Sequence, residues 1–236
     1  MDPNTPLIVP EVNAHAIKQH KGVIANPNCS TIIMVVPMWP LHQAAGIERA
    51  VVSTYQAASG SGDQAMKELE EQARQWARGE TDYKQDIWGR QYIWNVFPHN
   101  SKVDPQSLYN EEELKMIKET NKIFESDTIR VDATCVRVPV LRTHCESINL
   151  TFRDNLSAKD ALQILSKAPG IKIIDDIEKS QFAEPLNASN QDDVIVSRVR
   201  QDLSQPEGKG INMWIAGDQI RKGAATNAVQ IAQLLL

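Results

Sequence analysis

The sequence has few cysteines and no long apolar run, and these scarcities exclude several classes of protein. Its three cysteines, Cys29, Cys135 and Cys145, are odd in number and form no CxxC pair, which argues against a disulfide framework and against a zinc site. No stretch approaches the roughly 18 apolar residues of a membrane helix. The N-terminus also lacks a basic segment followed by an apolar one. We therefore expect a soluble intracellular protein with no bound metal and no membrane partner.

An excess of positive charge is absent too. The formal net charge is -5 at pH 7, so the composition does not favour nucleic acid or an anionic membrane surface as a partner. The rest of the composition is ordinary for a folded protein: 236 residues, 42% hydrophobic and 23% charged. That length fits one large domain or two small ones. A small anion can still bind at a local basic cluster.

The apolar pattern divides the chain into strands and helices. Alternation predicts strands over 49–59, 128–141, 144–153, 192–203 and 210–219. Helical spacing predicts helices over 63–79, 110–125, 157–170 and 223–236. Residues 80–109, rich in aromatic residues, Pro and Asn, form a long irregular excursion, for instance one that contacts a partner subunit. This order predicts an α+β (α/β) fold, a mixed and largely antiparallel sheet with helices on one face.

Two helices carry more specific expectations. The helix that begins near Ser30 is predicted to reach at least Val36, because Pro37 and Pro40 disturb the next turns. The terminal helix, residues 223–236, is apolar nearly all round. Such a helix is expected to be buried against another surface.

Cys29 lies at the start of the first long helix, between Asn28 and Ser30. The positive end of the helix dipole and the unpaired amide groups stabilise a thiolate there and lower its pKa, as a nucleophile requires. A buried free thiol, the commonest state of an intracellular cysteine, fits the same position. Position alone leaves both interpretations open.

Two polar residues continue the apolar faces of neighbouring strands. Arg137 follows the phase of Ile129 and Ala133, and His144 shares the phase of Ile148. A guanidinium that points inward needs a carboxylate or phosphate partner. Each residue alone can be structural, and the pair supports a site and a structural role about equally.

Other polar motifs have simple structural explanations. The segment 60–65 fits the dinucleotide pattern GxGxxG/A, but Asp63 would repel a pyrophosphate. A Gly-rich turn could nevertheless approach a ligand closely. Glu113 occupies the capping-box position of its helix, and Lys115 has Glu111 and Glu119 four residues away on either side, as in a solvated salt-bridged face.

Five motifs, taken together, carry a resemblance to a known family. They are NPNCST (26–31), TYQAASGSG (54–62), EEELKMIKE (111–119), ATCVRVPVLRTHCES (133–147) and GDQIRKGAATNAVQIA (217–232). In this order and spacing the chain resembles the aspartate-semialdehyde dehydrogenases over nearly its whole length. The resemblance implies NADP-dependent conversion of L-aspartyl 4-phosphate to L-aspartate 4-semialdehyde, toward lysine, threonine and methionine. It also implies a homodimer, located in the cytoplasm or, in a plant or alga, in a plastid.

The resemblance assigns roles to individual residues. Cys29 would be the nucleophile that forms a thioacyl enzyme, His144 the general acid and base, and Arg137 the residue that holds the substrate carboxylate. The remaining roles are substrate orientation by Gln56, contact with the substrate amino group by Glu113, phosphate binding by Lys115 and Asn28, and NADP binding by Ser59, Gly60 and Gln219.

The resemblance also predicts a division of the chain. Residues 29–216 would form the catalytic and dimerisation domain of a two-domain fold like that of glyceraldehyde-3-phosphate dehydrogenase. Residues 1–28 and the helix 217–236 would be remnants of a Rossmann domain whose Gly-rich phosphate-binding turn is not found in this sequence. We therefore expect the chain alone to bind NADP poorly. The alternative functions are a non-catalytic dimerising fragment and a reductase of N-acetylglutamyl phosphate.

Overall fold

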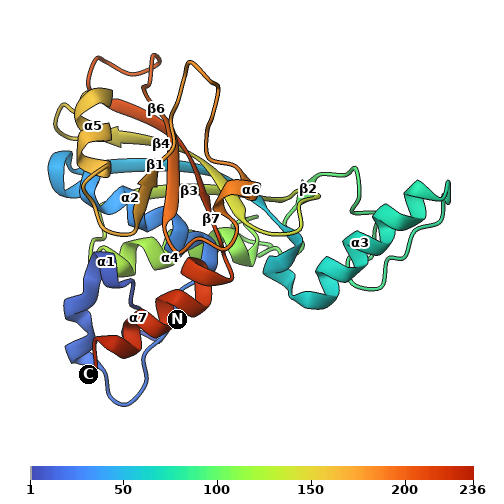
Figure 1. The fold of residues 1–236 in the computed structure, drawn as a ribbon. Coiled ribbons are helices and arrows are strands. Elements are labelled where there is room, and N and C mark those ends of the chain that lie inside the picture. Colours follow the sequence, from blue (N-terminus) through green and yellow to red (C-terminus); the bar gives the residue numbers. More distant parts are fainter. Residues whose placement is uncertain (1) are drawn as a thin grey trace.

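A seven-stranded mixed sheet forms the centre of the molecule (Figure 1), whose computed structural model describes residues 2–236. The strands are β1 (Ile47–Gln56), β2 (Phe97–Pro98), β3 (Arg130–Arg137), β4 (His144–Phe152), β5 (Ile171–Ile173), β6 (Val194–Gln201) and β7 (Gly210–Gly217), in the order β2-β3-β1-β4-β7-β6-β5. β1 with β3 and β5 with β6 are parallel, and the other neighbours are antiparallel. The predicted mixed, largely antiparallel sheet is confirmed.

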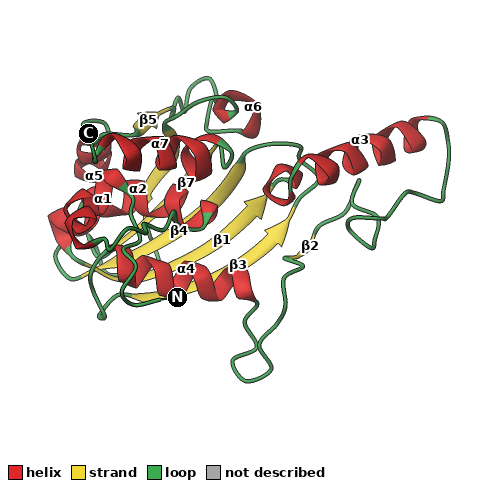
Figure 2. Ribbon diagram, turned by 90° about the horizontal axis from the view of Figure 1, so that it is seen from below, coloured by secondary structure: helices red, strands yellow, loops and turns green. Residues whose placement is uncertain are grey.

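The longer helices lie mainly on one face of this sheet (Figure 2). The helices are α1 (Pro10–Asn13), α2 (Cys29–Ala45), α3 (Asp63–Ala77), α4 (Glu111–Ile123), α5 (Ala158–Leu165), α6 (Pro185–Ala188) and α7 (Thr226–Gln233). α4 packs on β3, and α2 packs on β4, β6 and β7 and also on α4 and α5. Within residues 2–236, no helix combines the length and the apolar character needed to cross a membrane.

α2 is the buried centre of the core and runs further than its prolines suggest. It continues through Pro37 and Pro40 to Ala45. An interior proline costs a helix about 3 kcal/mol, whereas each fully buried aliphatic side chain contributes about 1.5–3 kcal/mol. Seven consecutive residues of α2, from Ser30 to Val36, are at most 1% exposed, and most of them are aliphatic. Burial therefore outweighs the two missing hydrogen bonds.

α3 and residues 80–109 form an arm that projects from one edge of the sheet (Figures 1 and 2). The excursion is irregular, as predicted, but it is tied to α3. The Glu68 carboxylate accepts from the Ile87 and Trp88 amides, and the Gln72 side-chain oxygen accepts from the Tyr92 amide at 2.7 Å. The arm then returns to the sheet as β2, which pairs with the end of β3.

The terminal helix is packed on one side only. α7 buries Asn227 and Ile231, and Ile231 packs on Ile8 and Ile17 near the N-terminus. Val229 is 58% exposed. Residues 2–236 therefore cover one side of α7, and the surface expected to bury the rest of this apolar helix does not lie within them.

Candidate active site

Three of the predicted site residues form one row across adjacent strands. The register of β1 and β3 pairs Gln56 with Arg137, and one residue beyond the last registered pair of β1 and β4, Gln56 faces His144. Side chains of paired residues lie on the same face of a sheet, and neighbouring strands are about 4.8 Å apart. Arg137 is 4% exposed and His144 is fully buried. The prediction that both point inward is confirmed, and we call Arg137, Gln56 and His144 the cross-strand row.

The first turn of α2 lies over this row. Cys29 is the first residue of the helix, and the hydroxyl of Ser30 accepts a hydrogen bond of 3.1 Å from the Gln56 amide. Asn28 is the N-cap: its side-chain oxygen accepts from the Thr31 amide at 3.1 Å. The position that the sequence suggested for Cys29, at a capped helix start, is confirmed.

The pKa of Cys29 differs from its expected direction. The residue is partly exposed, but its sulfur is surrounded by protein. Burial, and then the charge of Glu112, raise the pKa of the thiol to about 12, although the Ser30 amide and the charge of Arg137 act in the opposite direction. The helix N-terminus therefore does not by itself produce a thiolate, and the thiol needs a proton acceptor when it reacts.

His144 is neutral and presents a free ring nitrogen. Its Nδ1 accepts from the backbone amide of Ala57 at 3.0 Å, so the proton of the neutral ring sits on Nε2. Nε2 is buried and has no hydrogen-bond partner within residues 2–236. Burial, together with the nearby Arg137 and His99, lowers the pKa of His144 well below its ordinary value. A neutral imidazole with an unpartnered N–H at Nε2 can donate a proton to a group placed beside it.

Arg137 is buried without a bonded counter-ion. Its guanidinium donates to the Ala57 carbonyl at 3.2 Å, to the Ser61 hydroxyl at 2.9 Å and to Nε2 of His99 at 2.7 Å. These partners are all uncharged, and its Nε has no partner. Within residues 2–236 no carboxylate forms an ion pair with it. A buried cation with spare donors is a site for an anion such as a carboxylate.

The carboxylate of Glu113 does not contact the row. It accepts from the Asn110 backbone amide at 2.9 Å, which completes the capping box, and from the Cys135 backbone amide of β3 at 3.1 Å. Glu112 lies at the row instead. It accepts from the side-chain amides of Asn28 at 2.9 Å and Gln56 at 3.1 Å.

A signal for Glu112 was present in the sequence. Glu112 and Glu119 are seven residues apart and so share a helical face. Glu119 accepts from the Asn28 amide at 2.7 Å. The two acidic residues of α4 therefore position the segment that carries Cys29, and the capping role of Glu113 already indicated that its carboxylate was occupied.

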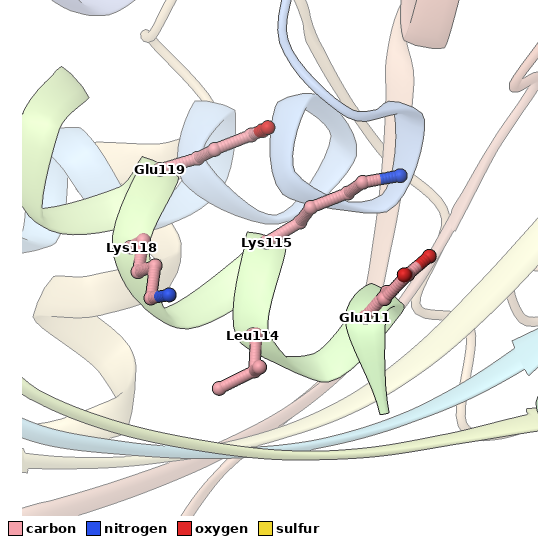
Figure 3. A pocket seen from close by; sticks show the side chains of 5 residues that line it. All are labelled: Glu111, Leu114, Lys115, Lys118 and Glu119. Atoms are coloured by element: carbon pink, nitrogen blue, oxygen red, sulfur yellow. The ribbon is translucent and has the colours of Figure 1, made fainter. Parts of the chain in front are cut away.

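Lys115 borders a pocket of about 230 Å³ on α4. Figure 3 shows Lys115 and Glu119 pointing to one side of α4, away from Leu114 and Lys118. Lys115 is exposed, and its ammonium group forms no ion pair with Glu111 or Glu119. The salt-bridged face expected from the spacing is therefore not formed, which leaves a free cation near the start of α2.

The three residues predicted to bind NADP lie together beside the row. The side-chain amide of Gln219 donates to the Ser59 hydroxyl and its oxygen accepts from the Thr143 amide at 2.9 Å. Gly60 lies in the turn Ala58–Ser61. A Cβ on Gly60 would come within 2.9 Å of Nε2 of His144 and 3.0 Å of a guanidinium nitrogen of Arg137. Glycine thus allows the turn to pass this close to the row.

Two further polar residues at the site escaped sequence reasoning. His99 contacts Arg137 from the arm. Glu146, two residues after His144 on β4, is fully buried and neither carboxylate oxygen has a partner within residues 2–236. Burial, followed by the charge of Glu112, raises the pKa of Glu146 well above its ordinary value. The inward phase that Glu146 shares with His144 could have revealed it.

Comparison with known proteins gives a consistent picture. The family described as "Semialdehyde dehydrogenase, dimerisation domain" matches residues 38–222. Aspartate-semialdehyde dehydrogenase from Synechocystis sp. is 50% identical over 236 residues, which is 100% of this chain and 69% of that protein. The crystal structure of aspartate semialdehyde dehydrogenase II from Vibrio cholerae, complexed with ASA, has a TM-score of 0.94 and 40% identity over 99% of this chain and 68% of that one. The Candida albicans enzyme, solved with NADP, has a TM-score of 0.73 and 23% identity over 99% of this chain and 67% of that one, and it shares the fold.

Proposed function

This chain belongs to the aspartate-semialdehyde dehydrogenase family, as its dimerisation and catalytic domain, and we propose that it performs the acyl-transfer chemistry of that family with Cys29 as nucleophile. The family reaction reduces L-aspartyl 4-phosphate to L-aspartate 4-semialdehyde and releases phosphate. The observation that carries the proposal is that Cys29 lies over two buried residues. One is Arg137, which has no counter-ion within residues 2–236, and the other is His144, which is neutral.

The charges around the row suit the two ends of an amino-acid substrate. Arg137 would bind the α-carboxylate, since its guanidinium is already fixed by neutral partners and retains a free Nε–H. Glu112 would attract the ammonium group, in place of Glu113, because its carboxylate lies beside Asn28 and Gln56. Gln56, between the two charged residues, would orient the substrate. The related Vibrio cholerae structure holds ASA, which supports an amino-acid aldehyde as ligand.

The covalent step can be derived from these positions. The sulfur of Cys29 attacks the acyl carbon, the bond from that carbon to the phosphate oxygen breaks, and phosphate leaves with the electron pair. The product on the chain is a thioester. The proton of the thiol leaves on the departing phosphate oxygen. His144, whose proton sits on Nε2, acts as a general acid and donates from that atom to the acyl oxygen, where negative charge develops.

The departing phosphate would be bound near Lys115. Within the described part of the chain, residues 2–236, this ammonium group has no carboxylate partner, and it borders the pocket on α4. Asn28 and the free amides at the start of α2 add hydrogen-bond donors, and a helix N-terminus favours anions.

We place the nicotinamide end of NADP against Ser59, Gly60 and Gln219. Gly60 lets the turn Ala58–Ser61 lie directly against His144 and Arg137, so a cofactor bound along this turn would lie next to the row. NADPH, when bound, supplies the hydride. Its presence in the related Candida albicans structure supports this assignment. We further propose that residues 29–216 act as the catalytic and dimerisation unit, and that 1–28 and 217–236 pack on a nucleotide-binding domain.

The chain would form a homodimer through the sheet face that α2, α4 and α5 do not cover. On that face α6 packs on β7 and, together with Ala183, covers Cys145, Ile195 and Ala216 on β4, β6 and β7. The aromatic pair Tyr55 and Trp214 lies there with ring centroids 5.2 Å apart, and Tyr55 is 36% exposed. The family description as a dimerisation domain supports this arrangement.

Release of phosphate in a single turnover tests the proposal. We expect one equivalent of phosphate per chain from L-aspartyl phosphate, and Cys29→Ser gives the background of spontaneous hydrolysis. N-acetyl-L-glutamyl phosphate should react more slowly, because its amino nitrogen carries no charge for Glu112. Equal rates would favour the alternative function, reduction of N-acetylglutamyl phosphate. The relatives from Synechocystis and Vibrio cholerae do not favour that alternative, because both are aspartate-semialdehyde dehydrogenases. The absence of any release above background would indicate a non-catalytic fragment.

A further inference from the structure

His99, in the arm, hydrogen-bonds to a side chain of the cross-strand row. It directly follows β2, and its backbone amide donates to the Cys135 carbonyl at 2.8 Å, which fixes it beside β3. Its Nε2 lies 2.7 Å from the guanidinium of Arg137. Because a guanidinium only donates hydrogen bonds, Nε2 must accept from it.

The opposite side of the ring continues this link to α4. Nδ1 lies 3.0 Å from the Ser101 hydroxyl, and that hydroxyl accepts from the Glu112 backbone amide at 3.3 Å. His99 and Ser101 thus join Arg137 to the first turn of α4, where the Glu112 carboxylate faces the row. The two residues that would bind opposite ends of the substrate are held by the same short chain of hydrogen bonds.

We propose that His99 is a positioning residue that fixes the Arg137 guanidinium while leaving its charge available to the substrate carboxylate. An aspartate or glutamate in the same place would fix Arg137 equally well but would neutralise it. The groups that face His99 favour the neutral ring: burial, Arg137 and Lys115 lower its pKa to about 4, although Glu112 acts in the opposite direction. The inference rests on the proposed role of Arg137.

The test measures the half-saturating concentration of acyl phosphate in the single-turnover phosphate release. His99→Ala should raise it for L-aspartyl phosphate by about tenfold, the effect of a lost hydrogen bond to a charged group, with a smaller change in the maximal rate. His99→Gln keeps an acceptor and should restore most of the loss. His99→Glu should be the worst of the three, because it neutralises Arg137.

β-Alanyl phosphate, which is L-aspartyl phosphate without the α-carboxylate, separates positioning from general disturbance. The three His99 variants should bind it like the parent chain. An equal loss with both substrates, or His99→Glu as good as His99→Gln, would overturn the inference. The variant Arg137→Gln separates failure of the His99 inference from failure of the proposed Arg137 role. If Arg137→Gln weakens binding of L-aspartyl phosphate and His99→Ala does not, only the inference about His99 is wrong. If neither variant weakens binding, the proposed role of Arg137 is wrong as well. Thermal unfolding of each variant shows that it is folded.

Discussion

Cys29 and His144 are both held uncharged by burial, and this limits what each can do before substrate arrives. Burial raises the pKa of the Cys29 thiol to about 12, and burial with Arg137 and His99 nearby lowers the pKa of His144 well below its ordinary value. A preformed thiolate and imidazolium pair is therefore disfavoured at neutral pH. Proton transfer from the thiol has to accompany attack on the substrate.

Alkylation of Cys29 should show this directly. Iodoacetamide reacts with the thiolate, so the rate at pH 7.5 should be far below that of free cysteine and should rise about tenfold per pH unit up to about pH 10. Mass spectrometry of the Cys29 peptide measures the rate, with N-acetylcysteine as the reference. A plateau near the pKa of an ordinary thiol would contradict the assigned environment.

Glu146 predicts a pH dependence of stability. Its raised pKa means that the folded chain keeps a proton that the unfolded chain loses above about pH 4.5. Stability is therefore lost as the pH rises above that value, by up to about 1.4 kcal/mol per pH unit. Glu146→Gln removes this loss. The free energy of unfolding of this variant minus that of the parent chain should therefore be larger at pH 7.5 than at pH 5.5.

Urea unfolding at the two pH values provides the measurement for Glu146. Glu48→Gln, which alters an exposed glutamate of β1, is the matched control. The same pH dependence in both variants would show that Glu146 does not retain its proton.

The polar residues differ in how far the sequence predicts them. Arg137 and His144 were placed correctly because the period of a strand fixes which face a residue occupies. Adjacent residues of a helix lie about 100° apart, so Glu112 and Glu113 face different neighbours. The assignment of the substrate contact to Glu113 came from the family resemblance, although the correctly predicted capping box already occupied that carboxylate. The pKa of Cys29 and the orphaned carboxyl of Glu146 depend on contacts between distant segments, which no local pattern contains.

The contact between β7 and α2 holds Cys29 over the row, and Gly217 makes it possible. A Cβ at Gly217 would lie 2.8 Å from two side-chain carbons of Ile33. Gly217→Ala should destabilise the chain by about 1–3 kcal/mol, the usual cost of overpacking, and should slow acyl transfer because the first turn of α2 shifts.

The double variant Gly217→Ala, Ile33→Ala tests whether the contact itself is responsible. If it is, the free energies of unfolding of the two single variants will not add, since removing the Ile33 side chain relieves the clash. Additive losses would assign the cost to some other contact of Gly217.

The elements that the sequence missed are those that carry no periodic signal. β2 has two residues and β5 has three, too few for an alternation to be recognised. The parallel pairing of β1 with β3 also cannot be derived from alternation, because it depends on which strands become neighbours. The strands that form the row are long enough for their alternation to be recognised. The inward direction of the residues in the row could therefore also be predicted.

The open sheet face should decide the oligomeric state of the molecule. In a symmetric dimer each face meets its own copy, so a charge added to Tyr55 appears twice in the interface. Tyr55→Lys should weaken the dimer by at least about tenfold in Kd. Sedimentation equilibrium compares it with Leu203→Lys, a change at a residue that is 96% exposed in the turn between β6 and β7. Equal dissociation of both variants would place the interface elsewhere.

The thiol of Cys29, the unpartnered Nε2 of His144 and the guanidinium of Arg137, which forms no ion pair within residues 2–236, lie at the same end of the sheet, as the proposed acyl transfer requires. Intact-protein and peptide mass spectrometry after brief exposure to L-aspartyl phosphate, with an acid quench, tests this most directly. We predict one aspartyl group per chain, attached to Cys29, removed by hydroxylamine and absent from Cys29→Ser. The account would be contradicted if the aspartyl group were attached to Cys135 or Cys145. It would also be contradicted if the folded chain carried no aspartyl group after exposure to the acyl phosphate.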